Sequence, residues 1–219
     1  MNAVASTIAR RALLTGILAG AGGAIAASAA KAADPLEDLL RRIADARARV
    51  RSVQGPFVQV RTIGLLAADV RSTGTFWLVR PDRLRWQLDP PDDVTFWITP
   101  EGLAYRDPHG QARLPAATAR WAAALDDLRT LLGGDVTRLR DRWDLRVRKD
   151  DATGAELEAS PRTDASSTLR NMRFSLAPDL VRPTRATLTE GPRDRTVIDF
   201  GALLVDAPID ESLLRPPPR

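Results

Sequence analysis

Side chains able to do acid–base, nucleophilic or metal chemistry are few in this chain. It has no cysteine and one histidine, His109, in the turn-like sequence 107–110. A single histidine cannot form a multi-histidine metal site, and without cysteine there is no thiol nucleophile. Adjacent acidic residues occur at Asp92-Asp93, Asp126-Asp127 and Asp150-Asp151, but neighbouring residues do not face each other on a helix or strand. Because a hydrolase would need a nucleophile motif that the sequence lacks, we predict no enzyme activity, cofactor or metal.

One charged residue stands on an apolar strand face. Side chains alternate across a strand, so Phe76, Leu78 and Arg80 share one side of the predicted strand 70–79 and its end. Pro81 ends that strand directly afterwards. An unpaired guanidinium against apolar surface is costly. We therefore expect hydrogen-bond acceptors near Arg80 and treat it as the first functional candidate.

The next strand, 83–89, presents apolar side chains on one face and polar side chains on the other. Two such neighbouring strands create a broad apolar surface. The side chains expected to line a cavity on this surface are Phe76, Leu78, Leu84, Trp86 and Leu88.

Two amphipathic helices are predicted to cover the sheet. The first begins with Asp34 as its N-cap and Pro35 at its first position, and its apolar residues keep helical spacing up to Val53, before Gly55-Pro56. The second spans 116–132. The side chains expected to face the sheet from these helices are Leu36, Leu40, Ile43, Trp121, Leu125 and Leu128.

The remaining segments read as consecutive antiparallel strands separated by Gly, Pro and Asp turn signals. A sheet of so many strands must close or be covered on one face. We predict a mainly β (α+β) fold, an unclosed antiparallel barrel or strongly curved sheet of about ten to eleven strands, with an N-terminal and a central helix over its concave face. The expected strands are 57–62, 70–79, 83–89, 94–99, 103–106, 143–148, 155–159, 168–176, 184–190 and 195–200.

The N-terminus has the pattern of an export signal. Arg10 and Arg11 precede an apolar, Ala- and Gly-rich run, and Ala30-Lys31-Ala32 has the small-x-small form of a cleavage site. The run is too weakly hydrophobic to favour a membrane anchor. We predict a cleaved signal peptide at 1–32 and one domain at 33–219, located in the periplasm, with the Sec and Tat routes both open.

Cleavage would change the charge balance. The formal net charge of +4 would fall to +1, because residues 1–32 hold three basic side chains and no acidic one. Such a small excess does not favour nucleic-acid binding. With no cysteine to carry a lipid anchor at the end of the leader, we expect the mature protein to be a soluble monomer.

The segment 74–107 also resembles a known family, the LolA-type periplasmic carriers of bacterial lipoproteins. The resemblance is most specific in its R-P-x-x-L-x-W portion and extends, more weakly, from Leu36 to the Pro-rich C-terminus. The residues that carry it are Gly74, Phe76, Trp77, Leu78, Arg80, Pro81, Leu84, Trp86, Pro91 and Asp92.

This resemblance implies an unclosed barrel with helices as a lid over an apolar cavity for the acyl chains of lipoproteins. It implies transport from the inner to the outer membrane, with a lipoprotein-releasing ABC transporter and an outer-membrane acceptor as partners. It also implies that Arg80 latches the lid and assists handover. A purely structural role, in which Arg80 ties a helix to the sheet, is the alternative.

Some features depart from the family pattern. The hairpin after the fourth strand is Pro100-Glu101-Gly102, and the aromatic cluster that follows it is reduced to Leu103-Ala104-Tyr105-Arg106. A carrier of another lipid or long apolar product on the same scaffold is therefore the second hypothesis. A lipid-sensing regulator is a third, disfavoured because the sequence holds one such domain.

Overall fold

The computed structural model describes residues 34–64, 68–110, 126–133, 135–162 and 169–216. Its helices are α1 (Pro35–Arg47), a helical segment at 126–132, and the 3-10 helices η1 (Val136–Asp141) and η2 (Glu211–Leu214). Its strands are β1 (Ser52–Ile63), β2 (Ala68–Val79), β3 (Arg83–Leu88), β4 (Thr95–Thr99), β5 (Gly102–Arg106), β6 (Trp143–Asp151), β7 (Gly154–Pro161), β8 (Asn171–Leu176), β9 (Pro183–Thr189), β10 (Arg195–Phe200) and β11 (Leu204–Val205).

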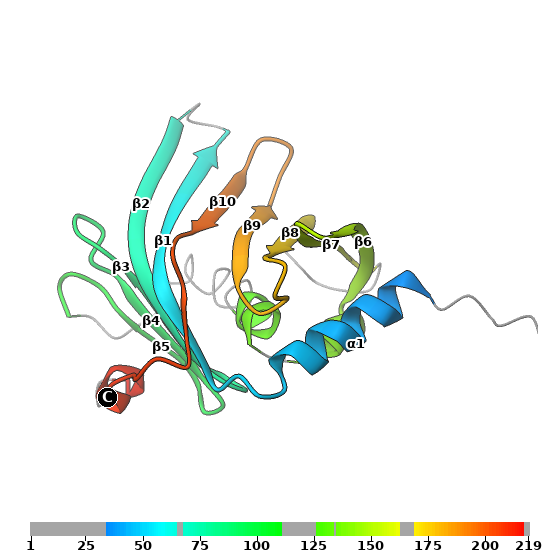
Figure 1. The fold of residues 1–219 in the computed structure, drawn as a ribbon. Helices are drawn as coiled ribbons and strands as arrows, with labels where there is room; N and C mark the ends of the chain where they lie inside the picture. Colours follow the sequence, from blue (N-terminus) through cyan, green and yellow to red (C-terminus); the bar gives the residue numbers. More distant parts are fainter. Residues whose placement is uncertain (1–33, 65–67, 111–125, 134, 163–168, 217–219) are drawn as a thin grey trace, which may run out of the picture. The chain divides into compact units, whose positions relative to one another are not determined.

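The strands form one antiparallel sheet in the order β5-β4-β3-β2-β1-β10-β9-β8-β7-β6, and β11 also pairs with β1. Ten of the eleven strands follow one another along this path, and among the described residues its two ends, β5 and β6, do not pair. The sheet is strongly curved and stays open (Figure 1). The predicted fold class, an unclosed antiparallel sheet of about ten to eleven strands, is confirmed.

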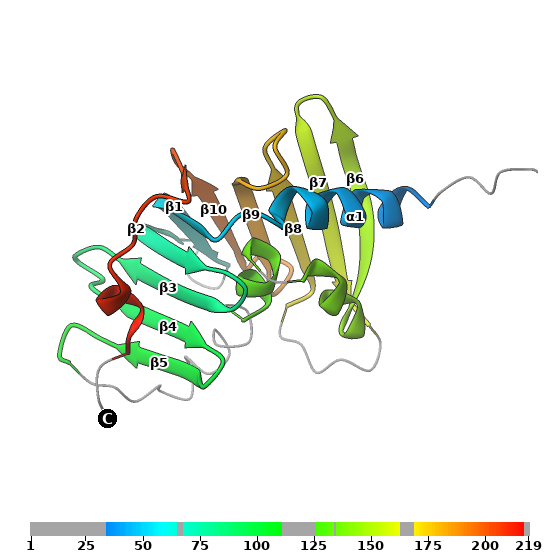
Figure 2. The same cartoon turned by 60° about the horizontal axis from the view of Figure 1, so that its bottom comes forward.

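Helix α1 and the segment 126–132 cover the inner side of the curve. Helix α1 runs across the open side next to β6, and the sheet bends round the segment 126–132 (Figures 1 and 2). Buried side chains of α1, of this segment and of the inner face of the sheet belong to one hydrophobic cluster. Burial of a shared apolar surface therefore holds the helices on the sheet.

Helix α1 begins as predicted and ends earlier than predicted. The side chain of Asp34 accepts a hydrogen bond from the backbone N–H of Leu36, at 2.9 Å, and Pro35 is at the first position. The helix ends at Arg47, whereas we expected it to reach Val53. Val53 instead lies in β1, because the ladder of β1 with β2 pairs all twelve residues of each strand. Pairing within the sheet has overridden the helical spacing of the sequence.

Aromatic rings fill the N-terminal half of the inner face. The rings of Phe57 and Trp86 stack with their centroids 3.8 Å apart, and Phe76 lies 6.0 Å from Trp86. A Cβ atom on Gly74 would lie 2.5 Å from the Phe57 ring and 2.1 Å from the carbonyl oxygen of Gln87. The glycine that opens the sequence motif therefore makes room for the aromatic stack.

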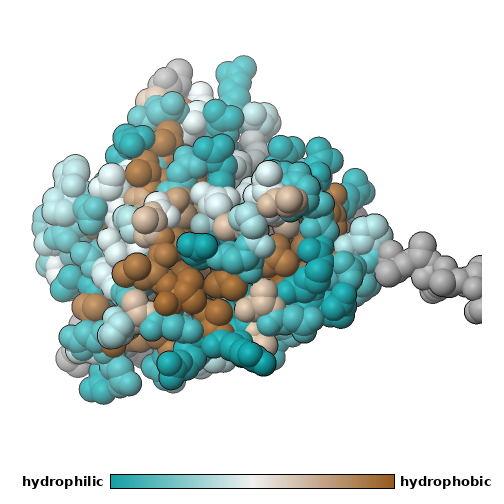
Figure 3. Space-filling view, viewed as in Figure 1, coloured by the Kyte–Doolittle hydropathy of each residue, from teal (hydrophilic) through white to brown (hydrophobic). Residues whose placement is uncertain are grey.

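The C-terminal segment runs along the outer side of the sheet. After β10 it forms β11, crosses β1 and β2, and ends in η2 next to β3 (Figure 1). An apolar patch is visible on this side of the molecule (Figure 3). Leu204 and Val205 of β11 contribute exposed apolar surface, at 58% and 38% exposure.

Candidate functional site

The five predicted cavity residues lie together on the inner face of β2 and β3. Phe76 is directly opposite Trp86, and Leu78 is directly opposite Leu84. These four side chains are fully buried, and Leu88 is half-buried against the same cluster. The structure therefore places all five in one apolar layer, packed against the protein's own side chains. Their contact with a ligand stays a prediction.

The predicted lid residues divide into three groups. Leu40, Ile43 and Leu128 are buried in the same cluster as the sheet residues, and Leu36 packs against it while half-buried. Trp121 and Leu125 lie outside the described residues. Both helical covers thus contribute apolar side chains to the layer above β2 and β3.

Arg80 follows directly after β2 and is half-buried. Burial lowers the pKa of its guanidinium. Its backbone N–H donates to the carbonyl of Arg51, at 2.9 Å, but its guanidinium has no hydrogen-bond partner among the described residues. The latch role of Arg80 stays a prediction.

A second arginine, which the sequence analysis missed, connects the helical covers. Arg47, the last residue of α1, is 1% exposed. Its Nη1 donates to the carbonyl of Leu131 at 2.8 Å, and its Nε donates to the carbonyl of Leu180 at 3.3 Å. Because Leu131 lies in the segment 126–132 and Leu180 lies between β8 and β9, Arg47 ties α1 to both. The signal was in the sequence, since Arg47 follows Ile43 by four residues and so continues the apolar face of α1.

The two arginines line the same cavity, of about 250 Å³. Burial, together with the nearby charge of Arg80, lowers the pKa of Arg47 to about 9, so Arg47 stays protonated at neutral pH. The Nη2 atom of Arg47 is buried and has no hydrogen-bond partner among the described residues. The residues that line the cavity are Leu40, Ile43, Ala44, Arg47, Arg80, Pro81, Gly133, Asp135, Val136 and Thr137.

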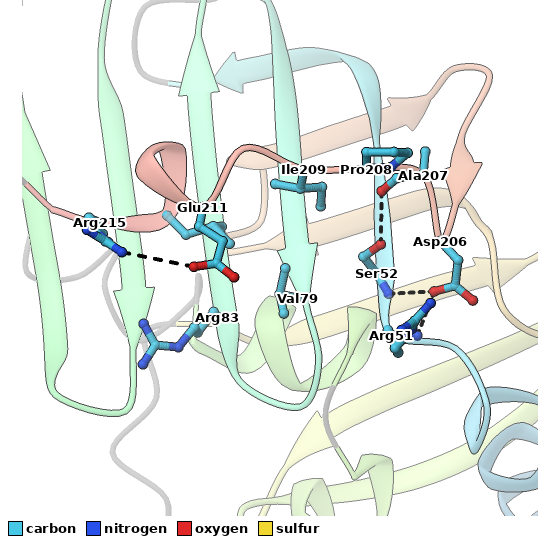
Figure 4. A pocket seen from close by; sticks show the side chains of 11 residues that line it. Arg51, Ser52, Val79, Arg83, Asp206, Ala207, Pro208, Ile209, Glu211 and Arg215 are labelled. Atoms are coloured by element: carbon cyan, nitrogen blue, oxygen red, sulfur yellow. Dashed lines mark hydrogen bonds and ion pairs between the residues drawn. The ribbon is translucent and has the colours of Figure 1, made fainter.

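A larger pocket, of about 700 Å³, lies between the C-terminal segment and the nearby ends of β1, β2 and β3 (Figure 4). The carboxylate of Asp206 accepts hydrogen bonds from the backbone N–H groups of Arg51 and Ser52, at 2.7 and 2.9 Å. Glu211 pairs with Arg215 at 4.0 Å. Both carboxylates are therefore engaged by groups of the protein itself, and Asp206 connects the C-terminal segment to the start of β1. We assign this pocket a structural role.

The outer face of the sheet also has a polar contact with its cover. The carbonyl of Leu213, in η2, accepts hydrogen bonds from the indole N–H of Trp97 at 2.9 Å and from Nη1 of Arg85 at 3.2 Å. The guanidinium of Arg85 lies 5.1 Å from the ring centroid of Trp77 and 5.3 Å from that of Trp97. These contacts hold η2 on β3 and β4.

Two observations concern membrane spanning and metal binding in the described part of the chain. None of the described helices is long and apolar enough to cross a membrane. No group of three or more His, Cys, Asp or Glu side chains is arranged to bind a metal ion among the same residues.

Comparison with solved structures gives distant matches. A crystal structure of MucB has 19% sequence identity and a TM-score of 0.50, over 82% of this chain and 62% of that chain. A DUF1329 family protein from Desulfovibrio piger has 13% identity and a TM-score of 0.49, over 83% of this chain and 98% of that chain. A LolA superfamily protein from Nitrosomonas europaea has 11% identity and a TM-score of 0.46, over 82% of this chain and 96% of that chain.

Comparison of sequences is more decisive. A search of curated protein sequences found no match. The family model described as outer membrane lipoprotein carrier protein LolA matches residues 48–215. This span contains every strand and begins directly after α1. Since this match takes in well over half of the chain, the protein belongs to the LolA family.

Proposed function

We propose that this protein is a periplasmic carrier that shields the acyl chains of lipoproteins and ferries them from the inner to the outer membrane. The observation that carries the proposal is the single apolar cluster that the inner face of the sheet shares with α1 and the segment 126–132. Acyl chains would enter this layer by separating the helical covers from β2 and β3. The lipoprotein or lipid-binding carrier fold of the family supports this assignment.

The energetics suit a carrier that must also release its load. Each buried methylene contributes roughly 0.8 kcal/mol, so one long acyl chain contributes on the order of 10 kcal/mol. In the structure the apolar layer is closed by the protein's own side chains. Opening it separates Leu40, Ile43 and Leu128 from the side chains that bury them. The free-energy cost of this separation offsets part of the binding energy of the acyl chain. Binding is then tight enough for transport and weak enough for handover.

The two arginines are the groups that would set the cost of opening. Arg47 donates to carbonyls of two other segments, and these charge-assisted bonds must break when the covers separate. Arg80 lies in the same cavity. In this proposal Arg80 latches the helical covers from within this cavity while the protein carries or releases its load.

The same proposal includes the export of the carrier and its partners. Residues 1–32 are a cleaved signal peptide, and the domain at 33–219 acts as a monomer without catalytic activity. Its partners are acylated lipoproteins, an inner-membrane lipoprotein-releasing ABC transporter and an outer-membrane acceptor.

A carrier of another lipid on the same scaffold is the second candidate. Two arginines at the edge of the apolar layer favour it, because the acyl anchor of a lipoprotein does not itself need two cationic partners. The two candidates differ in cargo and share the binding layer.

A release assay tests the proposal. The mature domain is incubated with spheroplasts, and the supernatant is analysed by native mass spectrometry for bound species. A soluble one-to-one complex with an acylated lipoprotein is the expected result. A complex with free lipid alone would favour the second candidate, and a protein that releases and binds nothing would overturn both.

Arg80→Leu is assayed in parallel. We expect this variant to fold and to load lipoprotein but to pass it on poorly to an outer-membrane acceptor. Arg83→Leu is the matched control, because the side chain of Arg83 is 44% exposed and pairs with Glu101 at 3.6 Å. Normal handover by Arg80→Leu would contradict the latch role while leaving the carrier role in place.

A further inference from the structure

The cavity beneath α1 has a charged wall and an apolar wall. Arg47 and Arg80 supply two guanidinium groups, while Leu40 and Ile43 supply buried apolar surface that continues into the hydrophobic cluster. A cavity of this construction matches an amphiphile, which carries a charged group at the end of an apolar chain.

The nearby carboxylates do not neutralise the two arginines directly. Asp135 also lines the cavity, but its Oδ1 accepts hydrogen bonds from the backbone N–H and the hydroxyl of Thr137, at 3.0 and 2.5 Å. Asp179 attracts Arg47 electrostatically, yet its own oxygens accept from Val181 and Arg182. Both acids are thus engaged in turns, and no carboxylate forms an ion pair with Arg47 or Arg80 among the described residues.

The hydrogen-bond donors of the two arginines are also incompletely used. Arg47 has two bonds to carbonyls, and its buried Nη2 has none. The guanidinium of Arg80 has no partner among the described residues. A buried donor without a partner carries a desolvation cost, and an anionic oxygen is the acceptor that would remove most of it.

We propose that this cavity receives the anionic head group, a carboxylate or a phosphate, of an acyl-chain ligand, with Arg47 and Arg80 as its two cationic partners. This inference rests on the proposed function and adds the chemical class of the cargo. The cavity volume of about 250 Å³ suits a head group. The acyl chain continues past Leu40 and Ile43 into the layer between the helical covers and the sheet.

The position of Arg47 couples this head group to the covers. The guanidinium that would meet the anion is the one that donates to Leu131 and Leu180. An anion that accepts from the free Nη2 atom draws the guanidinium toward itself and away from those carbonyls. Binding of the head group therefore weakens the connection between α1 and the segment 126–132 at the moment when the acyl chain needs entry.

A pair of ligands with the same chain and different head groups tests the proposal. Palmitate and methyl palmitate are compared as competitors that displace the fluorescent apolar probe 1-N-phenylnaphthylamine from the mature domain at neutral pH. We expect palmitate to compete more strongly by on the order of tenfold to a hundredfold, the effect of one or two charge-assisted hydrogen bonds. Arg80→Gln is expected to remove most of that preference.

Arg83→Gln is the matched control. It removes the same charge from the next strand, outside the cavity, and is expected to keep the preference for palmitate. Loss of the preference in both variants would indicate a general effect of net charge and would overturn the assignment of the site.

The other outcomes separate this inference from the proposed function. Equal competition by both ligands would overturn the head-group site and leave lipid binding in place. Failure of both ligands to displace the probe would overturn lipid binding, and the head-group site with it. A further arm adds inorganic phosphate at constant ionic strength. If phosphate binds through Arg80 while the acyl chain adds no affinity, the site takes a free anion, and the head-group assignment is wrong.

Discussion

Each face of the sheet is held under its cover by an arginine that donates to a backbone carbonyl. On the inner side Arg47 donates to Leu131 and Leu180, and on the outer side Arg85 donates to Leu213. Burial lowers the pKa of both arginines, and a second arginine nearby, Arg80 or Arg106 respectively, lowers it further. Each arginine also keeps one buried nitrogen without a hydrogen-bond partner among the described residues.

The surroundings of the two arginines differ. Arg85 is half-buried, lies over the rings of Trp77 and Trp97, and shares its carbonyl acceptor with the Trp97 indole. Arg47 is 1% exposed, donates to two backbone carbonyls and lies near the charge of Arg80. Two side chains therefore donate to the acceptor carbonyl in the outer contact, whereas Arg47 alone donates to the two acceptor carbonyls in the inner contact. Loss of the Arg47 side chain would remove both inner hydrogen bonds, whereas loss of the Arg85 side chain would leave the Trp97 bond in place.

Truncation of the two arginines should give the largest difference. Arg47→Ala leaves two carbonyls without their donor and removes a fully buried side chain, so we expect a loss of about 3 kcal/mol in the free energy of unfolding. Arg85→Ala keeps the Trp97 bond to Leu213 and should cost about 1.5 kcal/mol. Urea unfolding of both variants measures the difference. Equal losses would contradict the contrast between the two covers.

A buried carboxyl in the inner cover should make its stability depend on pH. Asp127, in the segment 126–132, is 4% exposed, and burial raises its pKa to about 6, although Arg142 lies 3.1 Å away and opposes the shift. Since this folded-state pKa is above the unfolded value, the folded protein binds more protons between pH of about 4 and 6. The stabilising contribution is fully present below that range and is lost as the pH rises through it.

Asp127→Asn cannot ionise and should remove this dependence. We expect the variant to be more stable than the parent at neutral pH, by on the order of 2 kcal/mol, and equal to it near pH of about 4. Thermal or urea unfolding across this pH range measures the effect. Asp126→Asn is the control, because its side chain is 49% exposed and pairs with Arg129. If the parent gained stability relative to Asp127→Asn as the pH rose to neutrality, the predicted direction of the pH dependence would be wrong.

The fold could be predicted from the sequence because its signals are local. Alternation in β2 and β3 identified the inner face, and Gly, Pro and Asp located the turns between strands. The end of α1 could not be predicted in this way. Val53 has helical spacing from the residues before it, but β2 supplies a pairing partner from elsewhere in the chain. The expected strand at 57–62 is accordingly longer at both ends.

The two arginine contacts were less predictable than the apolar layer. Arg47 continues the apolar face of α1, so its burial was readable from spacing, but its acceptors lie 84 and 133 residues away in the sequence. Arg80 was chosen from alternation as the residue that needs acceptors. In the structure the carbonyl acceptors belong to Arg47, and Arg80 shares its cavity. The outer cover gave no periodic signal, because η2 has four residues.

A smaller effect is expected from the second donor of the outer cover. Trp97→Phe removes the indole N–H that donates to Leu213 and keeps most of the ring, so we expect a loss of about 1 kcal/mol. Hydrogen exchange should show the loosening locally, at the amide of Leu213, which donates to Asp210 within η2 at 3.0 Å. Trp77→Phe is the control, because Trp77 contacts Arg85 through its ring. Faster exchange in the control alone would contradict the role of the indole bond.

The smallest effect should come from Arg80, and its sign separates the two roles considered for this residue. Since its guanidinium is half-buried, without a hydrogen-bond partner among the described residues and close to the charge of Arg47, Arg80→Gln should change the free energy of unfolding by less than about 0.5 kcal/mol. The change should be stabilising, and it should shrink at high salt, because screening already weakens the repulsion in the parent. Urea unfolding at low and high ionic strength measures both features. A loss of more than about 1 kcal/mol would instead mean that Arg80 ties a helix to the sheet through hydrogen bonds. Arg47 and Arg80 would then both be structural ties, and the latch role of Arg80 would lose its basis.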